Sequence, residues 1–293
     1  MRYVLENDTL RVEIDSFGAE LKSVKRKSDG KEYMWYADKK YWGRTSPVLF
    51  PFVGNCRNKE YRYGGKTYAM GQHGFARDME HTMESQTADT IWFSLHSNEE
   101  TMEKYPFAFV LKIGYNLTGN ELKVMWKVEN PDTKTLYFSI GAHPAFLCPF
   151  NGEENKLGYG LQFAGLKEVH HHGNTPDTGL AVMSEDIVIP LEDEKVYFTP
   201  GFFDRCTYMV EGKQTGEVSL VTPDGKPYVT MDFDAPLFAI WSPEGKDAPF
   251  VCIEPWYGRC DADDFEGTLE ERAYENAVEP EQAFEASYSI RYL

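Results

Sequence analysis

Three short segments carry residue types that can transfer protons and hold oxygen atoms. His73 lies in the segment QHGFAR, where a glycine permits close approach of the backbone to a ligand and Arg77 can bind oxygen atoms. His143 lies in GAHPAF, between small residues and a proline that stiffens the turn. Glu254 ends the apolar run FVCIE, which continues into Pro255, Trp256 and an adjacent tyrosine. Taken singly, each is also compatible with a structural role, as a satisfied histidine or as a surface glutamate at a strand end.

Together, two imidazoles and one carboxylate form an acid–base set suited to a carbohydrate. Aromatic rings next to Glu254 can stack on the apolar faces of a sugar, and an arginine can bind its hydroxyl groups. Signatures of other chemistries are absent: the sequence has no GxxxxGK[ST], no GxGxxG after a strand, no GxSxG and no HExxH. Nucleotide-dependent, α/β-hydrolase and zincin activities are therefore disfavoured.

The most conspicuous histidines are three in a row, His170, His171 and His172. A metal site needs ligands that converge from fixed directions, whereas adjacent residues on a loop diverge. We therefore expect a solvated loop here rather than a metal site.

The elements that must position these residues read mostly as strands, because apolar residues recur with a period of two. One long hairpin joins residues 109–117 to 122–128 through a Thr-Gly-Asn turn, and two more join 218–221 to 228–231 and 61–63 to 67–68. Further strands are expected at 10–14, 90–95, 136–140, 187–191, 238–241, 250–253 and 286–292.

Helical signals are sparse. Residues 99–105 can form one or two turns before Pro106, and a capping box at Thr268 predicts a second short helix over 268–277. Many short strands without interleaved helices indicate an all-β sandwich or barrel. Because no linker, repeat or low-complexity tract divides the sequence, residues 1–293 are expected to form a single domain.

Charge and cysteine content limit the partners and the location. Thirty basic against 47 acidic residues give a net charge of −17, which disfavours binding to nucleic acid or anionic lipid. No apolar run is long enough for a signal peptide or a membrane span. Five widely spaced cysteines, with no CxxC pair, favour reduced thiols in the cytoplasm.

At these segments the sequence resembles the aldose 1-epimerase (galactose mutarotase-like) family, and within it the LacX-like branch. The matching segments follow the family's order: PVLFPFVG at 47–54, GKTY at 65–68, HGFAR at 73–77, YPF at 105–107, AHPAF at 142–146 and CIEPWYG at 252–258. This resemblance implies a large antiparallel β-sandwich, the galactose mutarotase-like supersandwich, with a few short helices and a sugar site in a cleft on one sheet.

The resemblance also implies roles for individual residues. Glu254 corresponds to the general base, His143 to the general acid, and His73 to a second histidine near the ring oxygen. The expected substrate-binding residues are Arg57, Arg77, Asp204, Trp256 and Arg44, where Arg44 competes with Arg57 for one role and Arg205 is a further nearby cation.

The implied reaction interconverts the α and β anomers of an aldohexose by ring opening and reclosure, and it needs neither metal nor nucleotide. The expected partner is a small sugar, with the chain a monomer or homodimer. Three alternatives remain open: a hexose 6-phosphate 1-epimerase whose arginines hold the phosphate, a non-catalytic sugar-binding module, and a glycoside hydrolase using Glu254 with Asp204.

Overall fold

The computed structural model describes all 293 residues. The backbone is 48% strand and 5% helix, which confirms the predicted all-β class. The strands in chain order are β1 (Arg2–Glu6), β2 (Leu10–Asp15), β3 (Glu20–Arg26), β4 (Val48–Leu49), β5 (Glu60–Tyr63), β6 (Lys66–Ala69), β7 (Thr82–Gln86), β8 (Thr90–His96), β9 (Val110–Thr118), β10 (Glu121–Glu129), β11 (Leu136–Phe138), β12 (Ile140–Ala142), β13 (Ala145–Leu147), β14 (Gly160–Phe163), β15 (Glu168–Asn174), β16 (Ala181–Pro190), β17 (Lys195–Tyr197), β18 (Tyr208–Glu211), β19 (Glu217–Val221), β20 (Pro227–Phe233), β21 (Leu237–Trp241), β22 (Phe250–Tyr257), β23 (Asn276–Val278) and β24 (Ala283–Tyr292). The helical elements are α1 (Glu99–Lys104) and the 3-10 turns η1 (Arg57–Lys59), η2 (Ala76–Asp78) and η3 (Leu269–Glu271).

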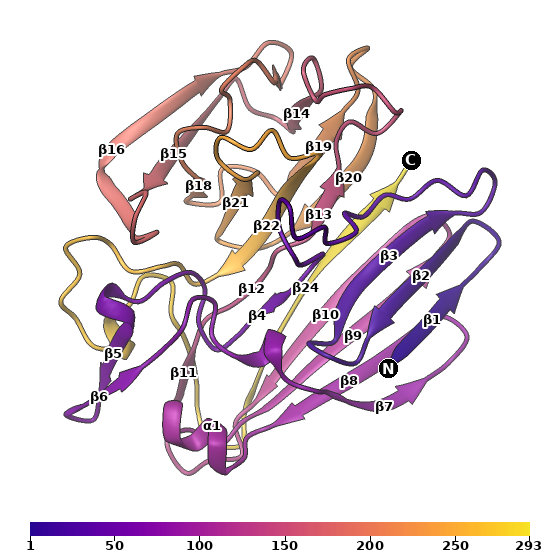
Figure 1. Cartoon of the computed structure of the whole chain (residues 1–293). Helices are drawn as coiled ribbons and strands as arrows, with labels where there is room; N and C mark the ends of the chain where they lie inside the picture. Colours follow the sequence, from indigo (N-terminus) through magenta and orange to yellow (C-terminus); the bar gives the residue numbers. More distant parts are fainter.

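Two large antiparallel sheets dominate the molecule (Figure 1). The nine-stranded sheet has the order β17-β14-β19-β20-β24-β10-β9-β8-β7. The eight-stranded sheet has the order β16-β15-β18-β21-β22-β12-β4, with β13 also paired to β22. A three-stranded sheet (β1-β2-β3) and the pairs β11-β23 and β5-β6 complete the fold.

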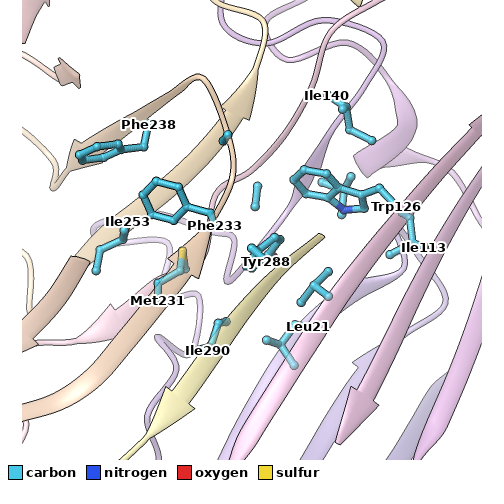
Figure 2. Close-up of a cluster of buried hydrophobic side chains, with 14 of the residues drawn as sticks. Leu21, Ile113, Trp126, Ile140, Met231, Phe233, Phe238, Ile253, Tyr288 and Ile290 are labelled. Carbon is cyan, nitrogen blue, oxygen red and sulfur yellow. The ribbon is translucent and has the colours of Figure 1, made fainter. Parts of the chain in front are cut away.

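The main hydrophobic core lies where the large sheets meet, and it contains 60 buried residues. Figure 2 shows Phe238 and Ile253 of the eight-stranded sheet next to Met231 and Phe233 of the nine-stranded sheet. Burying such side chains contributes about 1.5–3 kcal/mol each. The large number of aromatic residues in the sequence therefore goes mainly into stabilising the sandwich.

The predicted long hairpin is confirmed as β9 and β10. Leu117 pairs with Leu122 next to the turn, and Leu111 pairs with Val128 at the far end, so the alternating apolar residues of both strands share the buried face. Gly119 has a φ of +57° in the turn, a conformation that glycine adopts without strain. The other two predicted hairpins are β19-β20 and β5-β6.

Strand β22 is buried on both faces, so the side chains on the face away from the main core are buried as well. Val251 and Ile253 point into the main core, whereas Cys252, Glu254 and Trp256 alternate with them and face the other side of the sheet. The sequence analysis ended this strand near Ile253, but it continues through Pro255 to Tyr257.

Two sequence predictions are wrong. The helix expected over 268–277 is only the turn η3: its capping box forms at Thr268, but the backbone is extended again at Arg272. The Arg272 side chain is drawn into a buried ion cluster with Asp261 and Glu275, and this tertiary contact overrides the local helical signal.

The second correction concerns the histidine triplet, which forms strand β15 instead of a solvated loop. His170 bonds to Asp186, His172 bonds to the carbonyl of Glu185, and His171 points to the other face, buried against Tyr208. Pairing with β16 imposes this alternation, so the three rings diverge.

The predicted strand over 136–140 is divided into β11 and β12 at Ser139. All five cysteines are free thiols, and all five are buried. The one α-helix of the chain is too short and too polar to span a lipid bilayer.

Candidate active site

Strand register brings His143 opposite Glu254. Strands β12 and β13 both pair with β22, Gly141 with Trp256 on one side and Ala145 with Cys252 on the other. The ladder is interrupted between these pairs, at His143 and the following proline. As a result, His143 Nε2 lies 3.4 Å from Glu254 Oε2, although the residues are far apart in sequence.

The His143–Glu254 pair is buried without completed hydrogen bonds. Glu254 is 1% exposed and neither of its carboxylate oxygens has a hydrogen-bond partner, and the same is true of His143 Nδ1. Burial raises the pKa of the Glu254 carboxyl well above its ordinary value. Burial, together with the charge of Arg77, lowers the pKa of His143 to about 3. Both shifts favour the uncharged form of the pair, a protonated carboxyl beside a neutral imidazole.

Two tryptophans fix the ring of His143. Trp42 stacks on it with ring centroids 4.6 Å apart, and Trp241 approaches edge-on at 5.2 Å. Trp241 ends strand β21, whereas Trp42 comes from the irregular segment between β3 and β4. The sequence analysis did not assign either residue to the site. Trp241 carried a weak signal as the last residue of a predicted strand, and Trp42 carried none beyond its residue type.

His73 presents a second imidazole, with ring centroids 5.7 Å from those of His143. Its backbone is held at a φ of 64° by reciprocal bonds with Gly54: the His73 N–H donates to the Gly54 carbonyl at 2.8 Å, and the Gly54 N–H donates to His73 Nδ1 at 3.0 Å. Burial lowers the pKa of His73 well below its ordinary range, so the ring is neutral and its proton lies on Nε2. A Cβ at Gly74 would lie 2.3 Å from the Phe50 carbonyl oxygen, which explains the glycine after this histidine.

These groups line a cavity of about 430 Å³, a size typical of sites for small molecules. His73, His143 and Glu254 form one part of its wall, and Asp177 and Glu244 line it as well. The lining residues are Trp42, Gly54, Asn55, Gln72, His73, Arg77, His143, Asn174, Pro176, Asp177, Thr178, Gly179, Thr207, Trp241, Glu244, Glu254, Trp256 and Cys260.

Among the predicted substrate-binding residues, Arg77 and Trp256 line this cavity. Arg77 donates from Nη2 to the Gln72 carbonyl at 2.7 Å, and burial beside Arg44 lowers its pKa to about 10, so it is still charged at neutral pH. The Trp256 indole donates to the Ala142 carbonyl at 3.3 Å, which fixes its ring. The structure thus brings His73, His143, Glu254, Arg77 and Trp256 together.

The structure does not bring Asp204, Arg57 and Arg44 to this cavity. Asp204 lines a separate cavity of about 300 Å³ and accepts a hydrogen bond from the Gly245 N–H. Arg57 pairs with Glu266 at 3.2 Å, and Arg44 pairs with Asp78 at 2.8 Å. Asp204 and Arg57 are therefore bound to partners away from the His143–Glu254 pair. Arg44 does not line the cavity either, but it lies beside Arg77, and its charge contributes to lowering the pKa of His73 and of His143.

Other lining residues escaped the sequence analysis altogether. The segment from Asn174 to Gly179 closes the cavity on one side, and the Asn55 side chain donates to the Thr178 carbonyl at 2.9 Å. Glu244 follows strand β21 and adds a carboxylate to the wall. No motif marks these positions, because the segments that connect strands lack the regular alternation of apolar residues from which strands are predicted.

The fold is thus an antiparallel β-sandwich with a cavity that is lined by an imidazole and a carboxylate, both of which have buried polar atoms without hydrogen-bond partners.

The chain belongs to the aldose 1-epimerase family, whose model matches residues 1–261. It is 31% identical to the chromosomal protein LacX of Lactococcus lactis over 300 residues, which cover both chains completely. These matches confirm both the family and the LacX-like branch predicted from the sequence.

Solved structures show the same relationship. A galactose mutarotase related enzyme from Lactobacillus acidophilus is 36% identical with a TM-score of 0.94, covering 100% of this chain and 97% of its own. A galactose mutarotase-like protein from Lactobacillus casei is 30% identical with a TM-score of 0.91, covering both chains completely. The fold is therefore the predicted galactose mutarotase-like β-sandwich.

Proposed function

We propose that this protein is an aldose 1-epimerase that interconverts the α and β anomers of a free aldohexose. The observation that carries the proposal is the His143–Glu254 pair, 3.4 Å apart, buried, and lacking hydrogen-bond partners in a cavity large enough for a sugar. Buried polar groups are normally paired within the protein, so unpaired ones lining a cavity favour a ligand that completes their bonds.

The reaction requires removal of the proton from the C1 hydroxyl and protonation of the ring oxygen. Glu254 takes the first proton as the general base and His143 donates the second as the general acid, so the bond between C1 and the ring oxygen breaks and a free aldehyde forms. Rotation about the C1–C2 bond presents the other face of the aldehyde. The same two residues, with their roles exchanged, then close the ring to the other anomer.

Burial favours a form of the free pair that lies one proton transfer away from the form this cycle uses. The pKa shifts favour a protonated Glu254 beside a neutral His143, and transfer of the carboxyl proton to His143 produces the carboxylate base and the imidazolium acid together. Hydroxyl groups of a bound sugar that donate to the carboxylate favour this charged form. His73, with its proton on Nε2, serves as a neutral donor to the sugar, and Arg77 and Trp256 hold its hydroxyl groups and apolar face.

The charge of the cavity favours a neutral sugar over a hexose 6-phosphate. Arg77 is the single arginine or lysine of its lining, while Asp177 and Glu244 add two carboxylates. Arg44 and Arg57, which a phosphate would need as further cations, are paired with Asp78 and Glu266. Within the lining, a phosphate group would therefore meet two carboxylates and one cation, while the paired Arg44 lies beside Arg77 behind that lining.

Polarimetry of freshly dissolved α-glucose and α-galactose, in a buffer that catalyses mutarotation poorly, tests the proposal. The protein should accelerate the change in rotation, and Glu254→Gln should remove the acceleration. Glu103→Gln, an exposed carboxylate on α1, is the matched control and should retain it.

Other outcomes point to the rival functions. Tight sugar binding by calorimetry without any acceleration would contradict the proposal and favour a non-catalytic binding module. Strong inhibition of mutarotation by millimolar hexose 6-phosphate would contradict the choice of a free sugar.

A further inference from the structure

A buried thiol that the epimerase chemistry does not use lies beside the acid–base pair. Cys252 precedes Glu254 by two residues on β22, so both side chains point to the same face of the sheet. A ring nitrogen of His143, the Cys252 sulfur and a Glu254 oxygen lie within 4.8 Å of one another, all three residues being buried. Each is a donor type that transition metals bind.

The spacing of the His143 nitrogen and the Glu254 oxygen is close to that of two ligands in a tetrahedral metal site. Nitrogen and oxygen ligands about 2.0–2.2 Å from Zn²⁺ lie about 3.3–3.6 Å apart. The distance from His143 Nε2 to Glu254 Oε2 is 3.4 Å. The Cys252 sulfur lies within 4.8 Å of these atoms, whereas a sulfur ligand of a tetrahedral zinc ion would lie about 3.5–3.7 Å from them, so the thiol has to approach them when an ion binds.

The unsatisfied carboxylate of Glu254 gives a second indication of a ligand, one that the proposed sugar site shares. Both oxygens of Glu254 lack hydrogen-bond partners, the side chain is 1% exposed, and Glu254 and His143 line the cavity of about 430 Å³. Three protein ligands with an open fourth position toward a cavity match the coordination of an accessible zinc ion. A thiol and an imidazole favour such a soft ion over Mg²⁺ or Ca²⁺, which prefer all-oxygen sites.

We propose that His143, Cys252 and Glu254 form a binding site for a divalent transition-metal ion of the Zn²⁺ type, which we call the Cys252 site. The thiol and any carboxyl proton leave to solvent as H⁺ when the ion binds, and no electron is transferred. A bound ion occupies both members of the acid–base pair, so it acts as an inhibitor and not as a cofactor. This inhibitory consequence rests on the proposed epimerase function, whereas the binding itself does not.

Titration with Co²⁺ tests the site directly, because a Co²⁺–thiolate bond gives a charge-transfer band in the near ultraviolet. The wild-type protein should show this band with one Co²⁺ per chain, and Zn²⁺ should displace it. Cys252→Ala should remove the band and weaken Zn²⁺ binding by more than about tenfold, since loss of even an outer-shell partner costs about 10- to 100-fold. Cys148→Ala is the matched control, because Cys148 is equally buried but outside the trio.

Further variants keep the test decisive. Glu254→Gln should weaken Co²⁺ binding but retain the thiolate band, and Cys252→Ser, compared by thermal unfolding, replaces Cys252→Ala if the alanine variant does not fold. Absence of the band in the wild type, or its persistence in Cys252→Ala, would overturn the proposal. Mutarotation without a band would refute the Cys252 site alone, and a band in a protein without mutarotation would refute the proposed function alone.

Discussion

Two buried polar clusters in this protein differ in how their hydrogen bonds are completed. In the Arg272 cluster, the guanidinium bonds to Asp261 at 2.7 Å, to Glu275 at 3.0 Å, to Ser139 at 3.2 Å and to the carbonyl of Arg259 at 2.9 Å. In the His143–Glu254 pair, both carboxylate oxygens and one ring nitrogen have no hydrogen-bond partner.

The contrast separates structural from functional use of buried charge. The bonds of the Arg272 cluster join the chain around β23 to the rest of the fold, and the second carboxylate oxygen of Asp261 accepts from the backbone N–H of Arg57 at 2.8 Å. Of the four oxygens of its two carboxylates, Glu275 Oε1 alone has no partner. A ligand would find few free groups there. The His143–Glu254 pair keeps its polar groups unbonded and facing a cavity, at a cost in stability that a bound ligand can offset.

The largest expected effect is on the rate of the reaction, and it comes from a substitution in the His143–Glu254 pair. His143→Asn should lower the rate of mutarotation by about 10²- to 10⁴-fold, because it removes the general acid. The free energy of unfolding should change by no more than about 1.5 kcal/mol, the scale of the lost contact with Trp42. Polarimetry and urea unfolding on the same preparation measure both values. A near-normal rate would show that His143 is not the acid.

The reverse behaviour is expected in the Arg272 cluster. Arg272→Met should destabilise the protein by about 3–5 kcal/mol, because it leaves the Asp261 and Glu275 carboxylates buried without their cation. The rate per folded molecule should stay within about tenfold of the wild type, or about 1.4 kcal/mol in barrier height. Urea unfolding and polarimetry again separate the two values. A large loss of rate with unchanged stability would contradict the division between the clusters.

A smaller effect is expected from Trp42, which lies in the irregular segment between β3 and β4 and stacks on the ring of His143. Trp42→Leu should lower kcat by about 2- to 10-fold, since an aromatic pair contributes about 0.5–1.5 kcal/mol to holding the His143 ring. Trp42→Phe should restore most of the loss. The control is Tyr36→Leu, because Tyr36 is an exposed ring of the same segment and packs at a tilted angle against Trp35. A change confined to KM would instead indicate that Trp42 contacts only the sugar.

The sequence predicted the strands better than it predicted the site, for a physical reason. Alternation in β9 and β10 is a local property, so the hairpin could be read directly from residues such as Leu111 and Leu122. The meeting of His143 with Glu254 depends on the register of β12 and β13 against β22, which involves segments about one hundred residues apart. The order of the sequence motifs indicated that His143 and Glu254 act together. The pairing register of β12 and β13 with β22 explains why the two side chains lie 3.4 Å apart.

The errors have equally specific causes. The His170–His172 run was interpreted as a loop because contiguous polar residues carry no period, yet pairing with β16 makes it a strand. Asp204 and Arg57 were proposed for the site because short segments around them resemble the family's sequence. Both residues lie outside the strands, and a short resemblance does not determine where such a segment places its side chains. Trp42 was missed for the same reason.

The smallest expected effect concerns stability. It measures how much the Glu254 carboxyl, which has no hydrogen-bond partner, destabilises the fold. Burial raises the pKa of Glu254 in the folded protein, so the stabilising contribution of its protonated form is complete below the ordinary pKa of 4.5 and is lost as pH rises toward the raised value. The glutamine of Glu254→Gln cannot ionise. The Tm of this variant relative to that of the wild type should therefore increase as pH rises from about 4 to 7, by a few degrees at neutral pH. The contribution of His143, whose pKa is lowered to about 3, is destabilising on acidification in both proteins and largely cancels in the difference.

Thermal unfolding of the wild type, Glu254→Gln and the exposed control Glu103→Gln over this pH range measures the effect, and the control should follow the wild type. A difference in Tm that does not vary with pH would mean that the Glu254 carboxyl ionises in the folded protein as readily as in the unfolded chain. The surroundings of Glu254 would then already stabilise its charge, as the partners in the Arg272 cluster stabilise the charges there. A difference that grows with pH would show that an acid–base site is maintained here against the stability of the fold, as expected for a group that waits for a ligand to complete its bonds.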